Sequence, residues 1–128
     1  MSAKAIDWEE ASKQAGGDLE FLTEVLQDLL DEAETAKNDI HAGLESKNFD
    51  DVMKAAHRLK GSAAYLGCEA MRDCMMTVQH EAKKGITMTD EAEKDQLHTF
   101  LQNEYEKFLV ALNTLKEEVE AWFAKSKA

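Results

Sequence analysis

Residues 49–67, FDDVMKAAHRLKGSAAYLG, contain the pattern that decides the fold. Their apolar side chains recur at intervals of three and four residues, the spacing that places side chains on one face of an α-helix. The members of this face are Phe49, Val52, Met53, Ala56, Leu59, Ala63 and Leu66. Gly67 follows them, at the position where many helices end on a left-handed glycine. The stretch therefore predicts an amphipathic helix that buries one side and exposes the other.

A short helix and a long helix are expected before this stretch. The short helix covers residues 7–15, with Asp7 as its capping residue and the glycines at residues 16–17 as its end. The long helix starts near Asp18 and ends at a turn over residues 46–48. Its apolar face follows the same spacing of three and four residues. The members of this face are Leu22, Val25, Leu26, Leu29, Ala33, Ala36, Ile40 and Leu44.

Two further segments with helical spacing follow Gly67. The first ends at Gly85, and its core positions are Met71, Cys74, Met75, Val78 and Ala82. A loop over residues 85–88 leads into the last segment, which is either one long helix or a broken pair. The apolar positions of this segment are Leu97, Leu101, Phe108, Leu112, Leu115, Val119 and Trp122, with Phe100, Tyr105 and Phe123 beside them.

The composition favours helix along the whole chain. The 128 residues include no proline and six glycines, and they are rich in the helix formers Ala, Leu, Glu, Lys and Met. Four long amphipathic helices joined by short turns predict an all-α fold, an antiparallel up-and-down four-helix bundle with the short first helix across one end. We expect residues 1–128 to form a single domain. Because the chain begins with methionine, we expect it to be free-standing.

Charge and cysteine content exclude several classes of protein. The 26 acidic and 15 basic side chains give a net charge of −11, which repels nucleic acid and anionic membrane surfaces. No apolar run approaches the ~20 residues needed to cross a bilayer. Cys68 and Cys74, six residues apart in one expected helix, fit neither a metal motif nor a disulfide framework. We therefore expect a soluble intracellular protein with two reduced core thiols.

His57 is the distinctive residue of the central helix. A helical wheel places it about 120° from the centre of the apolar face, so its imidazole should be exposed to solvent. Met53, Gly61 and Ala64 lie along the same ridge, and the last two are small enough to leave the ring uncovered. Lys60, three residues after His57, can bring an ammonium group beside the ring. These residues predict a site where another protein approaches the histidine.

Ordinary explanations also exist for such residues. A single surface histidine commonly has no special role, and a glycine inside a helix, which costs roughly 1 kcal/mol relative to alanine, can serve close helix packing. Met71, Met75 and Met76 can fill gaps in the core. Met53 and Met76 fall on the flank nearest His57, where a soft apolar contact would suit a transient protein surface.

A longer motif favours the functional interpretation. The stretch AHRLKGSAAYLG at residues 56–67 resembles the signature of histidine phosphotransfer domains, in which a phosphorylatable histidine precedes Leu-Lys-Gly-Ser and a glycine follows ten positions on. Residues 18–26, DLEFLTEVL, resemble the opening of the second helix of this family. The resemblance covers most of the chain.

The resemblance implies a role for each residue of the motif. His57 would be the phosphoacceptor, Lys60 its charge partner, and Gly61 the residue whose missing side chain admits the active site of the partner. Ser62 would have a supporting role. Ala63 stands where a second serine is frequent in the family, a departure that alters a hydrogen bond without removing the chemistry.

A second row of side chains is expected on the following helix. Arg72, Met76, Gln79 and Lys83 are spaced by four, three and four residues, which places them on one flank. The resemblance implies that Gln79 lies beside the histidine and that Lys83 is a basic residue one turn further. A solvated polar flank is the alternative for this row. The residues expected to dock the partner are Met53, Ala64, Arg72 and Met76.

The resemblance implies a phosphoryl carrier, not an enzyme with a kinase activity of its own. The sequence has no Walker-type nucleotide loop. Receiver domains of hybrid histidine kinases and of response regulators would be the partners, and they would supply Mg²⁺, so that no bound cofactor is expected here. His57 would accept the group through Nε2, its more exposed ring nitrogen. The implied state is a monomer in the cytoplasm and, as in stand-alone carriers of eukaryotic relays, also in the nucleus.

Two other classes of helical bundle are the alternatives to a phosphoryl carrier. An adaptor would bind proteins through its grooves without chemistry, and a reactive histidine within the motif argues against it. A metal or haem bundle would need inward-facing ligands on facing helices, whereas His57 is expected to face outward. His41, His80 and His98 lie on different expected helices without paired ligand spacing. We therefore expect no metal site.

Overall fold

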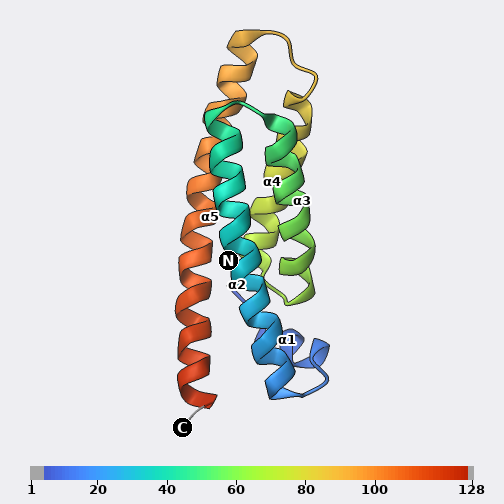
Figure 1. The fold of residues 1–128 in the computed structure, drawn as a ribbon, viewed down its shortest axis with the longest axis vertical. Coiled ribbons are helices and arrows are strands. Elements are labelled where there is room, and N and C mark those ends of the chain that lie inside the picture. The colour runs from blue at the N-terminus through green and yellow to red at the C-terminus, as the bar shows by residue number, and fades with distance from the viewer. Residues whose placement is uncertain (1–4, 127–128) are drawn as a thin grey trace.

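The computed structural model describes residues 5–126, and this range contains five α-helices (Figure 1). Their bounds are Trp8–Gln14 for α1, Leu19–Glu45 for α2, Phe49–Tyr65 for α3, Glu69–Gly85 for α4 and Glu91–Ser126 for α5. The described range contains no strand. The predicted all-α class is therefore confirmed.

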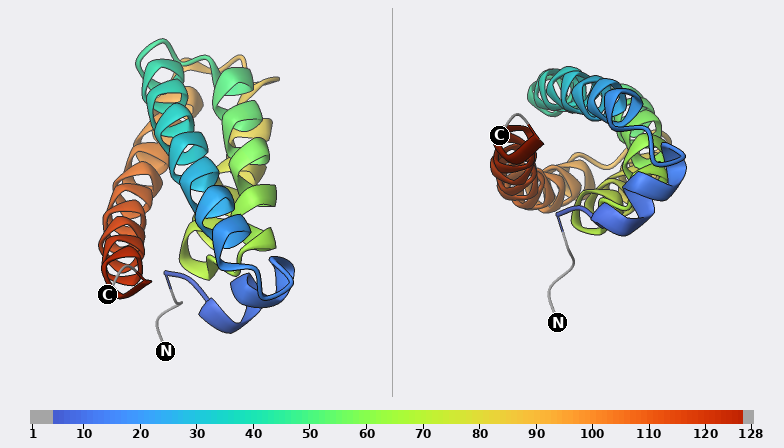
Figure 2. Two further views of the ribbon diagram at one scale, coloured as in Figure 1. Left: turned by 60° about the horizontal axis from the view of Figure 1, so that its bottom comes forward. Right: turned by 90° about the horizontal axis from the view of Figure 1, so that it is seen from below.

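Helices α2 to α5 run alternately up and down and form the predicted bundle (Figure 1). α3 packs against α2 and α4, and α5 closes the bundle against α4 and α2. α1 lies across one end, as the view from below in Figure 2 shows. The Asp7 amide donates a hydrogen bond to the Gly67 carbonyl (2.9 Å). The Trp8 ring stacks on the Trp122 ring with a centroid distance of 5.4 Å, so the turn after α3 and the C-terminal part of α5 help to hold α1 in place.

Short polar side chains and one glycine set the ends of the helices around α3. Asp18 caps α2 by accepting hydrogen bonds from two backbone amides, and Asn48 caps α3 by accepting one from the Asp51 amide at 3.2 Å. Gly67 has a φ of +71°, which is the left-handed conformation predicted for the end of this helix. A Cβ at this position would lie 2.8 Å from the Cβ of Asp7. Backbone conformation and packing therefore both require glycine.

The last segment is one continuous helix of 36 residues, which decides between the two alternatives for it. Asp90 accepts a hydrogen bond from the Ala92 amide at 2.8 Å where this helix begins. α4 ends at Gly85 as predicted. A Cβ on this glycine would lie 2.6 Å from side-chain atoms of Phe49 and Leu97, so close packing requires glycine at this position.

The prediction for Cys68 was wrong in position. Cys68 lies at the N-cap of α4 and not inside a helix, because the chain turns at Gly67 immediately before it. Both cysteines are free thiols, as predicted, with Cys68 buried and Cys74 half-buried. Burial disfavours the charged thiolate, and it raises the pKa of Cys68 to about 12 and that of Cys74 to about 11.

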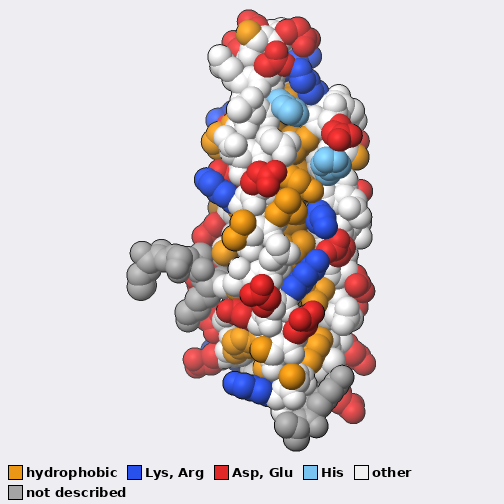
Figure 3. Space-filling view, turned by 90° about the vertical axis from the view of Figure 1, so that its left-hand side faces the viewer, with side chains coloured by type: hydrophobic (Ala, Val, Ile, Leu, Met, Phe, Trp, Pro, Cys, Tyr) orange, Lys and Arg blue, Asp and Glu red, His pale blue; other side chains and the backbone are white. Residues whose placement is uncertain are grey.

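The core lies between the predicted apolar faces of the long helices. Val52, Ala56 and Phe108 are fully buried there. On the face of the molecule that Figure 3 shows, charged side chains flank an apolar band that follows the long axis. Among residues 5–126, no helix combines the length and the apolar character that crossing a membrane requires.

Candidate functional site

His57 lies on the exposed side of α3. The side chains of Val52, Ala56 and Leu59, on the core side of the same helix, are at most 1% exposed. The predicted exposure of the histidine is therefore confirmed, since a residue about 120° from the core face points away from the interior. The ring forms no hydrogen bond or ion pair with another described residue. Its nitrogen atoms are available to a second molecule.

A hollow of about 440 Å³ between α3 and α4 has His57 in its wall. The remaining lining residues are Met53, Lys54 and Arg58 from α3, and Gln79 and Lys83 from α4. The structure thus brings together four of the predicted site residues, from two helices. Gln79 and Lys83 reach His57 because α3 and α4 pack directly against each other.

The other predicted site residues lie outside the wall of this hollow. Gly61 and Ser62 line a second hollow, of about 290 Å³, between α2 and α3. Arg72 forms an ion pair with Asp73 at 2.9 Å, so its charge is already partly balanced on α4. Met76 is 50% exposed, which fits an apolar docking contact. The predicted residues that line neither hollow are Lys60, Ala64, Arg72 and Met76.

Gly61 lies in open space, one turn beyond His57 on α3. A Cβ built on Gly61 meets no atom within 4 Å. Gly43 on α2 provides the contrast, because its Cβ would lie 2.7 Å from Cγ2 of Val52. Gly43 therefore serves close helix packing, whereas Gly61 does not. The absent side chain at position 61 leaves room only on the outside of the protein.

The cations around His57 differ in how they are paired. Lys54 forms an ion pair with Asp50, one turn earlier on α3, at 2.9 Å, and this hydrogen bond raises the pKa of Lys54. Lys60 and Lys83 form no ion pair with any residue in the described range. Two unpaired ammonium groups make the surface near the histidine locally positive, although the whole chain carries −11. An anion held by His57 would meet these groups.

Gln79 contributes an amide group with unused hydrogen-bonding capacity. Its Oε1 atom is buried and has no hydrogen-bond partner among the described residues. A buried acceptor without a partner costs roughly 1–3 kcal/mol, so a hydrogen-bond donor brought by a second protein is favoured at this oxygen, whereas an anion would pair with the Nε2 hydrogens of the same amide. This atom belongs to a residue in the wall of the His57 hollow.

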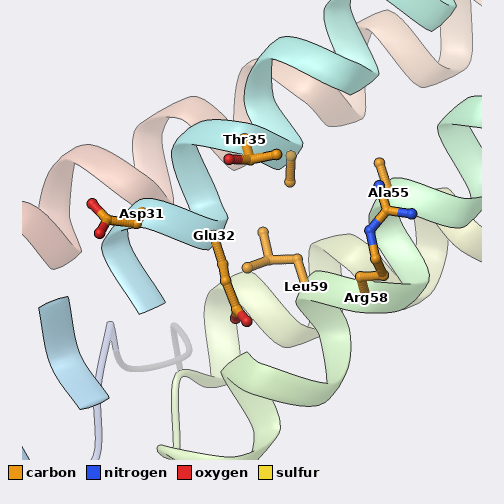
Figure 4. A pocket seen from close by; sticks show the side chains of 7 residues that line it. Asp31, Glu32, Thr35, Ala55, Arg58 and Leu59 are labelled. Atoms are coloured by element: carbon orange, nitrogen blue, oxygen red, sulfur yellow. The ribbon is translucent and has the colours of Figure 1, made fainter. Parts of the chain in front are cut away.

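Sequence reasoning missed Lys54 and Arg58 in the wall of the hollow. Lys54 lies three residues before His57, a spacing that could have been found on the helical wheel. Arg58 gave no such signal, because consecutive helix residues point about 100° apart. Its long side chain extends over the hollow between α3 and α2 (Figure 4). Its Nη2 lies 3.3 Å from Oδ2 of Asp39 on α2.

The donor set at the site does not suit a metal ion. The groups around His57 are ammonium, guanidinium, amide and thioether groups, whereas Mg²⁺ prefers carboxylate and water oxygens. Within residues 5–126, no group of three or more His, Cys, Asp or Glu side chains could hold a metal ion. The arrangement suits an anion instead.

The chain is similar to known signalling proteins. The model of the Hpt domain family matches residues 24–122. Signal transduction histidine-protein kinase BarA of Shigella flexneri is 27% identical over 85 residues, and so is BarA of Escherichia coli strain K12. These residues are 66% of this chain and 9% of the kinase, so the chain spans a small part of the length of these relatives.

Two solved structures share the fold. The HPT domain of an Hpt sensor hybrid histidine kinase from Shewanella gives a TM-score of 0.73 at 18% identity, covering 94% of this chain and 95% of that one. Histidine-containing phosphotransfer protein B (HptB) of Pseudomonas aeruginosa PAO1 gives 0.66 at 16% identity, covering 94% and 98%. Since the family model matches most of its length, the chain belongs to the Hpt domain family of histidine phosphotransfer domains.

Proposed function

We propose that this chain carries a phosphoryl group on His57 between the aspartates of two receiver domains, one in a hybrid histidine kinase and one in a response regulator. The observation that carries the proposal is the exposed imidazole of His57, without a partner in the described range, in the wall of a hollow lined by cations. A nucleophile in this position is accessible to a large partner and lies where an anionic group is favoured.

The transfer step uses the lone pair of a neutral ring nitrogen. Nε2 of His57 attacks the phosphorus of the phosphoaspartate, forming a P–N bond while the P–O bond to the aspartate breaks. The electron pair of that bond leaves with the aspartate as a carboxylate. The Nδ1 proton of the phosphorylated ring can then pass to water. For the second transfer Nδ1 regains a proton from water, and the carboxylate of the second receiver then attacks the phosphorus. The new P–O bond forms as the P–N bond breaks, and its electron pair stays on Nε2 of the neutral imidazole.

The neighbours of His57 have distinct roles in this proposal. The ammonium groups of Lys60 and Lys83 balance the charge of the phosphoryl oxygens, and each charge-assisted hydrogen bond contributes about 1.5–3 kcal/mol. The amide of Gln79 donates a hydrogen bond to the same group. Gly61 leaves the space that the receiver active site must enter.

The chemistry missing from this chain is assigned to its partner. The receiver brings Mg²⁺, which neutralises the equatorial oxygens of the phosphoryl group when bound. We propose a carrier without a kinase activity of its own, since the sequence has no Walker-type nucleotide loop. We further propose a monomer that acts in the cytoplasm. We do not extend the proposal to the nucleus, because the similar proteins named above are bacterial.

The test is transfer from a phosphorylated receiver domain, followed by mass spectrometry at neutral pH. We expect one phosphoryl group on His57 in the wild-type protein and none on His57→Gln, while circular dichroism shows the same helix content for both. His80→Gln is the matched control, because His80 is also an exposed histidine, on α4, and should leave acceptance unchanged. Labelling of folded His57→Gln at the wild-type level would refute the proposal.

A further inference from the structure

Arg58 occupies a position between two surfaces of α3. It lines the hollow that holds His57, and on the other side of the helix it lines the hollow of about 240 Å³ between α3 and α2 (Figure 4). The side chain is 63% exposed, so no packing restrains it. A guanidinium group on a flexible stem can therefore reach either side of the ridge that carries the histidine.

The present partner of Arg58 holds it weakly. Asp39 accepts one contact, from Nη2 at 3.3 Å, and its own side chain is 47% exposed. Exposed ion pairs of this kind add little stability because water screens the charges. A guanidinium has five N–H donors, and the contact with Asp39 uses one. Most of the donors of Arg58 are therefore available to a better acceptor.

A phosphoryl group on His57 would be such an acceptor. It carries more negative charge than the Asp39 carboxylate, and its three oxygens match the planar fork of a guanidinium in two parallel hydrogen bonds. Lys54 lines the same hollow but has a closer partner in its own helix, Asp50 at 2.9 Å. The ion pair of Arg58 is longer than that of Lys54, at 3.3 Å against 2.9 Å, so Arg58 should exchange its partner more easily.

We propose that Arg58 is a phosphoryl-binding residue that exchanges Asp39 for the phosphoryl group on His57. The proposal rests on the proposed function of His57. It adds a fourth cationic side chain, besides Lys54, Lys60 and Lys83, to the surroundings of the modified ring. It also connects phosphorylation to α2, because the exchange breaks the ion pair between Arg58 on α3 and Asp39 on α2 and leaves that carboxylate without this partner.

The test uses the full chain phosphorylated with potassium phosphoramidate, a small donor that requires no receiver. The ³¹P signal of the phosphohistidine is followed against pH, because a nearby cation favours the dianion and lowers the pH at its titration midpoint. Arg58→Gln is expected to raise the midpoint by about 0.7 pH unit, the effect in water of removing one charge in contact at ~4 Å. Asp39→Asn, which releases Arg58, is expected to lower the midpoint.

Lys54→Gln is the matched control, since it removes one cation from the same hollow without removing a guanidinium fork. Its midpoint should rise by less than that of Arg58→Gln. Equal midpoint shifts in the two variants would overturn the proposal, because Arg58 would then act only as a nearby charge, without direct hydrogen bonds to the phosphoryl group. A higher midpoint in Asp39→Asn would also overturn it, because Asp39 would then position Arg58 instead of competing for it. Absence of any P–N signal in the wild-type protein would refute the proposed function itself.

Discussion

The open space above Gly61 predicts that folding and phosphoryl transfer can be separated by one substitution. In Gly61→Gln, the new Cβ meets no atom within 4 Å, so the folded protein accommodates it without a clash. Replacing a helix glycine also removes its entropic cost, which favours the folded state by up to about 1 kcal/mol. For a domain of this size, we expect a melting temperature equal to wild type or up to about 4 °C higher.

Transfer should respond in the opposite direction. The glutamine side chain would project from the ridge one turn from His57, into the volume that a receiver must enter. If the receiver is held back by even ~1 Å, the reacting atoms leave the attack geometry, and the rate falls on the order of a hundredfold. The assay is a melting curve and single-turnover transfer from a phosphorylated receiver, both on one preparation.

Gly43→Ala is the matched control with the reverse expectation. Its Cβ would lie 2.7 Å from Cγ2 of Val52 and 3.2 Å from the Asn48 carbonyl, so the variant should lose roughly 1–3 kcal/mol of stability. At a temperature where it is folded, it should transfer normally. Wild-type transfer rates in Gly61→Gln would refute the steric argument. Unfolding of Gly61→Gln would show that the glycine is needed for packing after all.

Two further predictions concern Lys60 and the thiol of Cys74. Lys60→Ala should slow transfer roughly tenfold or more in rapid-quench measurements, because it removes a charge-assisted contact of about 1.5–3 kcal/mol. Lys13→Ala on α1 is the remote control. Equal rates for the wild-type protein and both variants would exclude a role for Lys60. Cys74, whose pKa burial raises to about 11, should react with iodoacetamide at pH 8 on the order of a hundredfold more slowly in the native protein than in guanidinium chloride, since less of it is thiolate. The rate in the native protein should increase with pH up to that pKa, and a native rate equal to the unfolded rate would contradict the burial of the thiol.

Local rules explain why so much of the fold could be predicted. The spacing of Val52, Ala56 and Leu59 determines a helix face wherever the helix lies, and all three are buried. Gly67 could be identified as a helix end because its left-handed backbone is a property of the residue itself. The position of Cys68 was predicted wrongly because helix ends read from sequence are uncertain by a residue or two, and Cys68 lies at the N-cap of α4, one residue before the helix begins.

Contacts between different helices could not be predicted from these local rules. The ion pair between Arg58 and Asp39 joins residues 19 positions apart, and nothing in the spacing within either helix indicates it. The burial of Oε1 of Gln79 likewise depends on how closely α4 approaches its neighbours. The length of α5 was left open for a related reason, because an apolar face shows helical spacing but does not show whether a helix bends.

One feature of the site could have been predicted from the sequence and was not. Within a helix, a lysine is neutralised by acidic residues three or four positions away, as Lys54 is by Asp50. Lys60 and Lys83 have no acidic residue at any of these positions, and in the structure neither forms an ion pair with a described residue. In a chain with 26 acidic side chains, positions that lack them are informative. The net charge of −11 disfavours polyanionic partners for the surface as a whole. The absence of acidic residues around Lys60 and Lys83, on neighbouring helices, still leaves positive charge beside His57, where Lys83 lines the same hollow.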